Sequence, residues 1–518
     1  MTDATLPPLV LDGRDVELAA VEAVAHRRCR VRLSDAPAFR ERIAAGPAFL
    51  DRLLAEDGVI YGVTTGFGDA CTRAVPAELH EELPRHLYTF HGCGLGEVLE
   101  VEAARAVVLV RLVSLCRGVS GVSLALLERL AWLLEHDVIP VIPAEGSVGA
   151  SGDLTPLSYL AAVLCGEREV FDGGRRRATA DAFAERGLAP YRLRPKEGLA
   201  LMNGTAVMTA LAALAWGRAE RLSRLASRIT AMSVWALDGN PYHFDADLFA
   251  AKPHPGQQRI AARLRDDLSH GTAAGVTPRN PSRLQDRYST RCAPHVIGVL
   301  EDALPWLHDQ LERELNSAND NPLIDAEAGK VLHGGHFYGG HVAFAMDALK
   351  PLVANLADLL DRQLALLVDP RYNHGLPANL SGATADRLAL NHGYKALQIG
   401  VSAWTAEALK LTMPASVFSR STECHNQDKV SMGTIAARDA LRVITLTEQV
   451  VAGVMHAAGQ ALDLRRERDA CAPPPALAAW QERLRRLVPF LSEDRALEAE
   501  LRRLCRRLPR LARHLYPE

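Results

Sequence analysis

Long segments in which apolar residues return every three or four positions constrain this chain more than any other feature of its sequence. That spacing places the apolar side chains on one face of a helix, and Ala and Leu, the strongest helix formers, fill these segments. Alternating runs of β-branched residues, which would indicate strands, are scarce. The sequence therefore predicts a mainly α protein, built as an elongated bundle of helices longer than the globular average. The helical segments are residues 98–136 (interrupted by Gly118 and Gly121), 205–237, 341–368, 384–411 and 433–464.

The balance of charged residues bears on whether the protein binds nucleic acids. The 518 residues include 59 Lys and Arg against 62 Asp and Glu, which gives a net charge of −3. A general nucleic-acid binder needs a basic excess to displace counterions, so we expect no nucleic-acid partner. The hydrophobic fraction of 48% and the charged fraction of 23% match a globular protein and exclude a largely disordered one.

Neither a membrane span nor an exported, disulfide-linked chain is expected. The most apolar stretch, residues 98–116, carries four charged side chains, and residues 1–11 lack the pattern of a signal peptide. Nine cysteines are scattered along the chain without a C-x-x-C pair. Their odd number and wide spacing are typical of reduced thiols, so we predict a cytoplasmic protein.

Polar, glycine-rich segments separate the helices, and binding residues concentrate on loops of this kind. We predict a loop-rich N-terminal part at residues 1–200 that carries the active site. Residues 201–518 then form the long-helix bundle with a C-terminal helical cap, the whole being one continuous catalytic unit. The Arg-rich, amphipathic tail at residues 481–513 is expected to be a solvated or subunit-facing cap. The polar segments are residues 61–69, 91–96, 146–153, 316–321 and 334–340.

The most informative polar segment is residues 146–157, GSVGASGDLTPL. It can be an ordinary turn before a helix, with Asp153 or Thr155 as cap and Pro156 at the first helical position. A second interpretation is chemical. Ala150, Ser151 and Gly152 are small enough to let the backbone fold tightly on itself, and Ser151 has a β-hydroxyl that dehydration can remove.

On this segment the sequence resembles the aromatic amino acid ammonia-lyase and aminomutase family, which includes histidine, phenylalanine and tyrosine ammonia-lyases. The resemblance implies that Ala150, Ser151 and Gly152 cyclise into a 4-methylidene-imidazol-5-one (MIO) group, with no dissociable cofactor. In that chemistry the amide nitrogen of Gly152 attacks the carbonyl carbon of Ala150, and two waters are lost. The product is an electrophilic methylene, which no ordinary side chain provides.

Further motifs carry the same resemblance in the family's order, so it covers most of the chain. It implies a histidine ammonia-lyase-like fold and a homotetramer whose active sites are assembled from more than one subunit. The motifs are residues 61–68 (YGVTTGFG), 198–205 (GLALMNGT), 285–292 (QDRYSTRC), 316–324 (NSANDNPLI), 334–337 (GGHF), 425–428 (HNQD) and 431–433 (SMG).

The reaction class explains which residue types are needed. The β-proton of an amino acid is weakly acidic and its amino group leaves poorly, so an electrophile that captures the amine assists the elimination. By resemblance, Tyr61 is the base that removes the β-proton, although a free phenol has a pKa of about 10 and needs tuning. Tyr61 can also be only a half-buried loop aromatic.

The remaining assignments concern the substrate's polar groups. Arg291 presents a planar fork suited to the substrate carboxylate, although a salt bridge is the commoner fate of an arginine, and Asn321 would share that carboxylate. Asn203 and Tyr288 would donate hydrogen bonds beside the MIO group. Asn203 can alternatively be a helix N-cap. Two further residues, Gln285 and Phe337, would line the chamber, and Phe337 can otherwise be plain core.

Two positions inform the choice of substrate. Phe90 and His91 stand where family members select the ring, and this pair matches none of the common ones. His91 can bond a phenol hydroxyl or an imidazole, or simply the backbone. Gln427 stands where histidine lyases typically have Glu. We therefore predict L-tyrosine as substrate, giving trans-4-coumarate and ammonia. Histidine, phenylalanine or a substituted phenylalanine remain alternatives, as does a 2,3-aminomutase.

A metal-dependent enzyme is the alternative to an ammonia-lyase or aminomutase. His333, His336 and His341 lie close together in the sequence, and zinc sites use closely spaced histidines. The segment lacks Cys or Glu at ligand spacing and coincides with a family motif, so we predict no metal.

Overall fold

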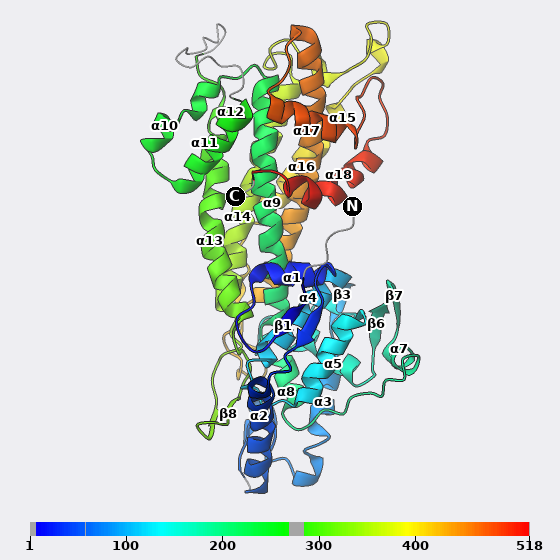
Figure 1. Cartoon of the computed structure of the whole chain (residues 1–518), viewed down its shortest axis with the longest axis vertical. Coiled ribbons are helices and arrows are strands. Elements are labelled where there is room, and N and C mark those ends of the chain that lie inside the picture. Colours follow the sequence, from blue (N-terminus) through cyan, green and yellow to red (C-terminus); the bar gives the residue numbers. More distant parts are fainter. Residues whose placement is uncertain (1–6, 57, 269–283, 517–518) are drawn as a thin grey trace. The chain divides into compact units, whose positions relative to one another are not determined.

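The computed structural model describes residues 7–56, 58–268 and 284–516, and these form two compact units (Figure 1). Unit 1 comprises Met1–Ala215, His308–Asp347 and Pro414–Arg438. Unit 2 comprises Trp216–Leu307, Ala348–Met413 and Asp439–Glu518. The sequence predicts a division at residue 200, between a loop-rich part and a helix bundle. That division stays a prediction. The boundary between the units falls inside four long helices, α9 (Ala206–Ala236), α13 (Ala293–Leu315), α14 (Gly340–Val368) and α16 (Gly433–Asp469).

The core of unit 1 is the helix α4, which is buried along almost its whole length and packs against α1 and α5. It ends where Gly118 and Gly121 adopt φ of +84° and +68°, a conformation that glycine reaches without strain. Ser123 then begins α5 by accepting a hydrogen bond from the Leu126 amide. The helices of unit 1 are α1 (Leu18–Ala25), α2 (Pro37–Ala55), α3 (Leu83–Phe90), α4 (Val101–Leu115), α5 (Leu124–Glu135), α6 (Leu154–Leu164), α7 (Thr179–Ala184) and α8 (Glu197–Met202).

Strands are few and short. β1 (Leu9–Leu11) pairs in parallel with β2 (Val31–Leu33). The other pairs are antiparallel: β3 (Leu95–Val98) with β5 (Pro143–Glu145), and β8 (Leu323–Asp325) with β9 (Lys330–Leu332). A three-stranded sheet has the order β4 (Val138–Pro140), β6 (Glu169–Asp172), β7 (Arg175–Ala178).

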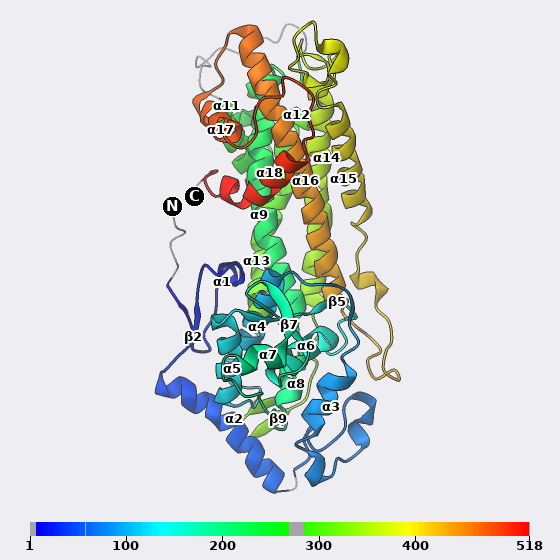
Figure 2. The same ribbon diagram turned by 90° about the vertical axis from the view of Figure 1, so that its right-hand side faces the viewer.

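Unit 2 is a bundle in which α9, α14 and α16 run side by side (Figures 1 and 2). Polar contacts also join these helices. Trp216 of α9 donates a hydrogen bond to the Leu304 carbonyl of α13, and Gln363 of α14 donates one to Thr230 of α9. Arg218 of α9 forms an ion pair with Glu448 of α16. Its other helices are α10 (Ala246–Ala250), α11 (Pro255–Leu268), α12 (Tyr288–Arg291), α15 (Lys395–Lys410), α17 (Pro475–Arg485) and α18 (Glu498–Ala512). Short 3₁₀ turns occur at Gly68–Thr72, Ala77–Leu79, Pro241–Phe244, Ala378–Leu380, Leu388–Leu390 and Ser416–Phe418.

The mainly α fold class is confirmed, and the helices predicted at 205–237, 341–368 and 433–464 are α9, α14 and α16. The helix predicted at 384–411 is wrong at its start, because α15 begins only at Lys395. Gly393 has a φ of +55°, and the amides of His392 and Gly393 donate to Asp494 instead of continuing a helix. Within the described residues, no helix combines the length and apolar character that spanning a bilayer requires.

Candidate active site

The Ala150-Ser151-Gly152 segment forms a tight turn between β5 and α6. Ser151 and Gly152 have φ of +51° and +80°, and Gly149 before them has +79°. A Cβ atom on Gly152 would lie 2.1 Å from the Gly204 carbonyl oxygen, so only glycine fits there. The structure thus has a turn at the three residues that the resemblance expects to cyclise.

Asp153 anchors this turn from beneath. Its amide donates to the Gly204 carbonyl over 2.8 Å. Its buried carboxylate accepts hydrogen bonds from the amides of Val207 and Met208, at 3.0 and 2.9 Å, and from the hydroxyls of Ser147 and Thr434. Burial raises the pKa of this carboxyl to about 6, although the four hydrogen bonds oppose the shift. The side chain therefore caps α9, and not α6 as the alternative interpretation of the sequence expects.

A cavity of about 470 Å³ opens above the turn, entirely within unit 1. Seven of the predicted site residues line it: Tyr61, Ala150, Ser151, Asn203, Asn321, Phe337 and Gln427. Other walls come from residues that the sequence analysis did not single out as site residues. These are Gly68, Cys71, Gly149, His333, Gly334, Tyr338, Asn426, Asp428 and Lys429.

Tyr61 is half-buried on one wall of the cavity. The Gly68 amide donates to its phenolic oxygen over 2.7 Å, which favours the phenolate. The pKa of Tyr61 is nevertheless raised, mainly because burial disfavours the charged form and further because the Glu423 carboxylate is near. Glu423 also accepts a hydrogen bond from the Asp69 amide at 2.8 Å, so it fixes the turn that contacts the phenol.

Gln427 contacts the turn itself. Its side-chain amide donates to the Ser151 hydroxyl over 3.0 Å, and its amide oxygen accepts from the Thr422 hydroxyl at the same distance. Both ends of this side chain are therefore engaged within the protein.

Asn203 and Asn321 form one bonded wall. The Asn203 amide donates to the Asn321 carbonyl over 3.0 Å, and the Asn321 side-chain oxygen accepts from the Gly334 amide at 2.8 Å. The Asn203 side-chain oxygen is buried and has no partner among the described residues. This acceptor needs a hydrogen-bond donor, which a bound molecule can supply.

A buried ion pair braces the two asparagines. The ammonium of Lys196 lies 2.5 Å from the Asp320 carboxylate, and both side chains are fully buried. Lys196 directly precedes α8 and Asn203 directly follows it. Asp320 accepts a hydrogen bond from the Asn321 amide at 2.6 Å. The sequence analysis missed this pair, whose only local signal is that each member adjoins a motif.

Phe90 and His91 lie at the end of α3 and do not line the cavity. Phe90 is 58% exposed. The Nδ1 atom of His91 lies 3.0 Å from the Leu87 carbonyl, so the backbone-bonded alternative for this histidine is observed. Burial lowers the pKa of His91, which favours the neutral imidazole. Since a carbonyl can only accept, the neutral ring carries its proton on Nδ1 and leaves Nε2 as an acceptor.

Gln285, Tyr288 and Arg291 belong to unit 2 and do not line the cavity of unit 1. Tyr288 is 72% exposed, and the Arg291 guanidinium lies 4.7 Å from the centre of its ring. Arg291 donates to the Asp286 carbonyl over 2.8 Å, and among the described residues it has no carboxylate partner. The salt-bridge alternative for this arginine is therefore not observed.

The described residues contain no group of three or more His, Cys, Asp or Glu side chains arranged to hold a metal. His333 instead lines the cavity, with its ring edge-on to Tyr61 at 6.5 Å between centroids.

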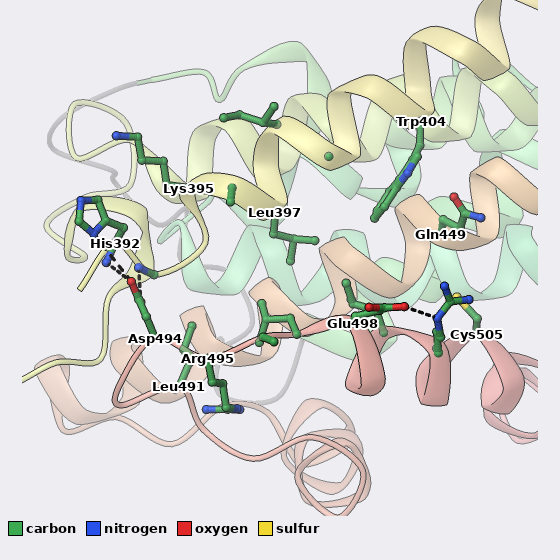
Figure 3. Close-up of a pocket in the computed structure, with 18 of the residues that line it drawn as sticks. His392, Lys395, Leu397, Trp404, Gln449, Leu491, Asp494, Arg495, Glu498 and Cys505 are labelled. Carbon is green, nitrogen blue, oxygen red and sulfur yellow. Dashed lines mark hydrogen bonds and ion pairs between the residues drawn. The ribbon is translucent and has the colours of Figure 1, made fainter. Parts of the chain in front are cut away.

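A larger cavity of about 1080 Å³ lies in unit 2, between α15, α16 and α18 (Figure 3). Leu397, Leu491 and Trp404 give it an apolar wall, and Asp494 points to the backbone of His392 at one end. None of the predicted site residues lines it, so its size does not make it the active site.

Comparison with known proteins finds one family along most of the chain. The model of the family described as aromatic amino acid lyase matches residues 16–486. A histidine ammonia-lyase of Gloeobacter violaceus is 41% identical over 496 residues, which are 96% of this chain and 95% of that protein. The histidine ammonia-lyase of Bacillus subtilis is 38% identical and covers 90% of this chain and 89% of its own.

Two solved structures are similar to this chain over almost its whole length. The tyrosine aminomutase from Streptomyces globisporus superimposes with a TM-score of 0.90, 34% identity and 99% coverage of both chains. The histidine ammonia-lyase from Trypanosoma cruzi superimposes with a TM-score of 0.89 and 31% identity, covering 99% of this chain and 96% of that one.

Proposed function

This chain belongs to the aromatic amino acid lyase family, and from that premise we propose that it eliminates ammonia from L-histidine to give urocanate. The protein is a carbon–nitrogen lyase. The family makes its MIO group from its own chain and needs no dissociable cofactor. Histidine is the first candidate because the named relatives that match nearly the whole chain at 38–41% identity are histidine ammonia-lyases.

The residues of unit 1 fit the MIO group. The positive φ values at residues 149, 151 and 152 and the clash that any Cβ on Gly152 would make meet at one turn. When formed, the group supplies an electrophilic methylene that captures the substrate's amine.

Tyr61 is the proposed base for the β-proton. Its phenol must lose a proton first, and the hydrogen bond from the Gly68 amide stabilises the resulting anion. Exclusion of water from this wall opposes ionisation and makes the phenolate a stronger base once it forms. Asn203 and Asn321, beside the buried Lys196–Asp320 pair, form another part of the lining and are proposed to bind the amine and the carboxylate.

We further propose that Gln285, Tyr288 and Arg291 complete the site from another copy of the chain in a homotetramer. Mixing inactive Ser151→Ala and Arg291→Ala chains during refolding tests this directly, because some mixed sites would contain both intact residues. Recovered activity supports shared sites. Mixed tetramers that form but stay inactive would contradict them, and an active monomer in light scattering would also do so.

His91 bears on which ring the substrate's side chain has. With Nδ1 bonded to the Leu87 carbonyl, its Nε2 accepts a hydrogen bond, which both an imidazole N–H and a phenol O–H can donate. A phenylalanine ring has no such donor, and would leave the acceptor unpaired at a cost of about 1–3 kcal/mol. We therefore place Phe90 and His91 at the ring end of the substrate.

L-Tyrosine, giving trans-4-coumarate, is the second candidate. It is favoured by the likeness to the tyrosine aminomutase of Streptomyces globisporus. Gln427 stays compatible with either candidate, because its amide oxygen accepts from Thr422 while its amide nitrogen is freed from Ser151 when the MIO group forms and the Ser151 hydroxyl is lost.

Purified enzyme incubated separately with histidine, tyrosine and phenylalanine decides between the candidates. Ultraviolet spectra identify urocanate, coumarate or cinnamate, and chromatography detects any β-amino acid from a 2,3-aminomutase. We expect urocanate to form fastest. Faster production of coumarate or of β-tyrosine would overturn histidine in favour of the second candidate. A cytoplasmic location stays a prediction of the sequence.

A further inference from the structure

A second polar cavity lies in unit 2, where α17 and α18 meet near the C-terminus (Figure 2). Its volume is about 390 Å³, within the usual range for small-ligand sites. The lining residues come from both helices and the segments that follow them. They are Trp480, Arg483, Arg486, Leu487, Arg507, Arg510, Leu511 and His514.

The lining of this cavity carries cations without counter-charges. Four guanidinium groups and one imidazole line it, and no Asp or Glu does. In the part of the chain that the structure describes, none of these four guanidinium groups has a hydrogen-bond or ion-pair partner. Other arginines of the same helices are paired: Arg485 with Asp463 at 2.6 Å, and Arg502 with Glu498 at 2.7 Å. Four of the unpaired guanidinium groups of this region therefore line one cavity, and that of Arg506 lines the larger one.

Trp480 is the buried residue of this lining, whereas the four arginines are exposed. Its side chain is only 3% exposed, and its buried indole N–H has no acceptor among the described residues. This N–H is too deeply buried to reach a ligand, so the guanidinium groups are the donors that face the cavity. The wall of the cavity therefore offers positive charge that no lining carboxylate balances.

We propose that this cavity binds a small molecule through a phosphate or polyphosphate group. The planar guanidinium fork matches two phosphate oxygens at once, and four such forks around one cavity suit more than a single charge. Trp480 is too deeply buried to stack on a base, so the cavity lacks the aromatic platform that single-stranded nucleic acids use. The site lies in unit 2, and its test does not depend on which amino acid the enzyme consumes.

The test is calorimetric titration of the full-length protein with inorganic pyrophosphate, repeated with ADP. Arg507→Gln combined with Arg510→Gln removes two charges from the cavity. The matched control, Arg502→Gln with Arg506→Gln, removes two charges from exposed positions of the same helix that do not line it. We expect saturable binding that weakens at least about tenfold in the cavity variant and about twofold or less in the control.

The two ligands distinguish the source of the phosphate. Equal affinities for pyrophosphate and ADP indicate that phosphate alone is recognised, and tighter binding of ADP indicates a nucleotide site; both support the proposal. Absence of saturable binding overturns it, as does equal weakening in the two variants. The surface could instead contact another subunit, so a change in the mass of the cavity variant in light scattering also overturns the proposal. Tighter binding of duplex DNA than of pyrophosphate overturns it as well.

Discussion

Replacing Lys196 with methionine tests whether the buried ion pair stabilises the active-site wall. In the wild type, the ammonium lies 2.5 Å from the Asp320 carboxylate and 3.2 Å from the Ser120 carbonyl. Methionine fills a similar volume and leaves the Asp320 carboxylate buried, with the Asn321 amide as its nearest donor. Breaking one partner of a buried pair costs about 3–5 kcal/mol, because the remaining charge is uncompensated.

The buried Arg111 guanidinium interacts electrostatically with Asp320 and moderates this cost. We therefore expect the lower end, about 3 kcal/mol, which is about a hundredfold in the folding equilibrium. Urea unfolding followed by circular dichroism measures it, at one protein concentration because assembly contributes to stability. Lys330→Met, an exposed lysine of unit 1, is the matched control and should change stability by about 0.5 kcal/mol or less.

A double-mutant cycle separates the pair from its surroundings. Asp320→Asn keeps an oxygen for the Asn321 amide and removes the charge, so Lys196→Met with Asp320→Asn should cost clearly less than the sum of the single changes. Additive costs, or a Lys196→Met protein as stable as the Lys330→Met control, would refute the reasoning.

Three further predictions concern the chemistry. Ser151→Ala should abolish turnover and the ultraviolet absorbance of the MIO group, and mass spectrometry should find only the wild-type chain lighter by two waters; an active variant would rule out the mechanism. Glu423→Gln removes a negative charge that disfavours the Tyr61 phenolate, so the pKa of Tyr61 falls and the limb of activity that rises with pH moves to lower pH, by about one unit or less. An unmoved limb would contradict the role of Tyr61 as base. Treatment with EDTA should leave activity unchanged, and a loss restored by zinc would revive a metal site at His333 and His336.

Local periodicity made the long helices predictable. The helices α9, α14 and α16 match the predicted segments closely, because one apolar stripe repeats along each of them. The start of α15 was not predictable, because it depends on Asp494, a residue about a hundred positions away that bonds the amides before the helix.

The site was predictable where motifs mark it, and not where contacts cross the chain. The sequence predicted the Tyr61 and Ser151 segments, and unit 1 brings both to one cavity. The Lys196–Asp320 pair spans 124 positions, and the bond from Gln427 to Ser151 spans 276, so no local pattern announces either. The expectation that Phe90, His91, Gln285, Tyr288 and Arg291 share the chamber is not met within unit 1, and it stays a prediction for the assembled protein.

Unit 1 is built from three separate segments of the chain, which are synthesised at different times. Ser151 leaves the ribosome early, but its partner Gln427, and Thr434, which holds Asp153, are translated only near the end. A nascent chain that stops before residue 414 lacks the last segment of unit 1 and cannot surround the turn with its native neighbours. We therefore expect the cyclisation of residues 150–152 to follow the synthesis of residues 414–438.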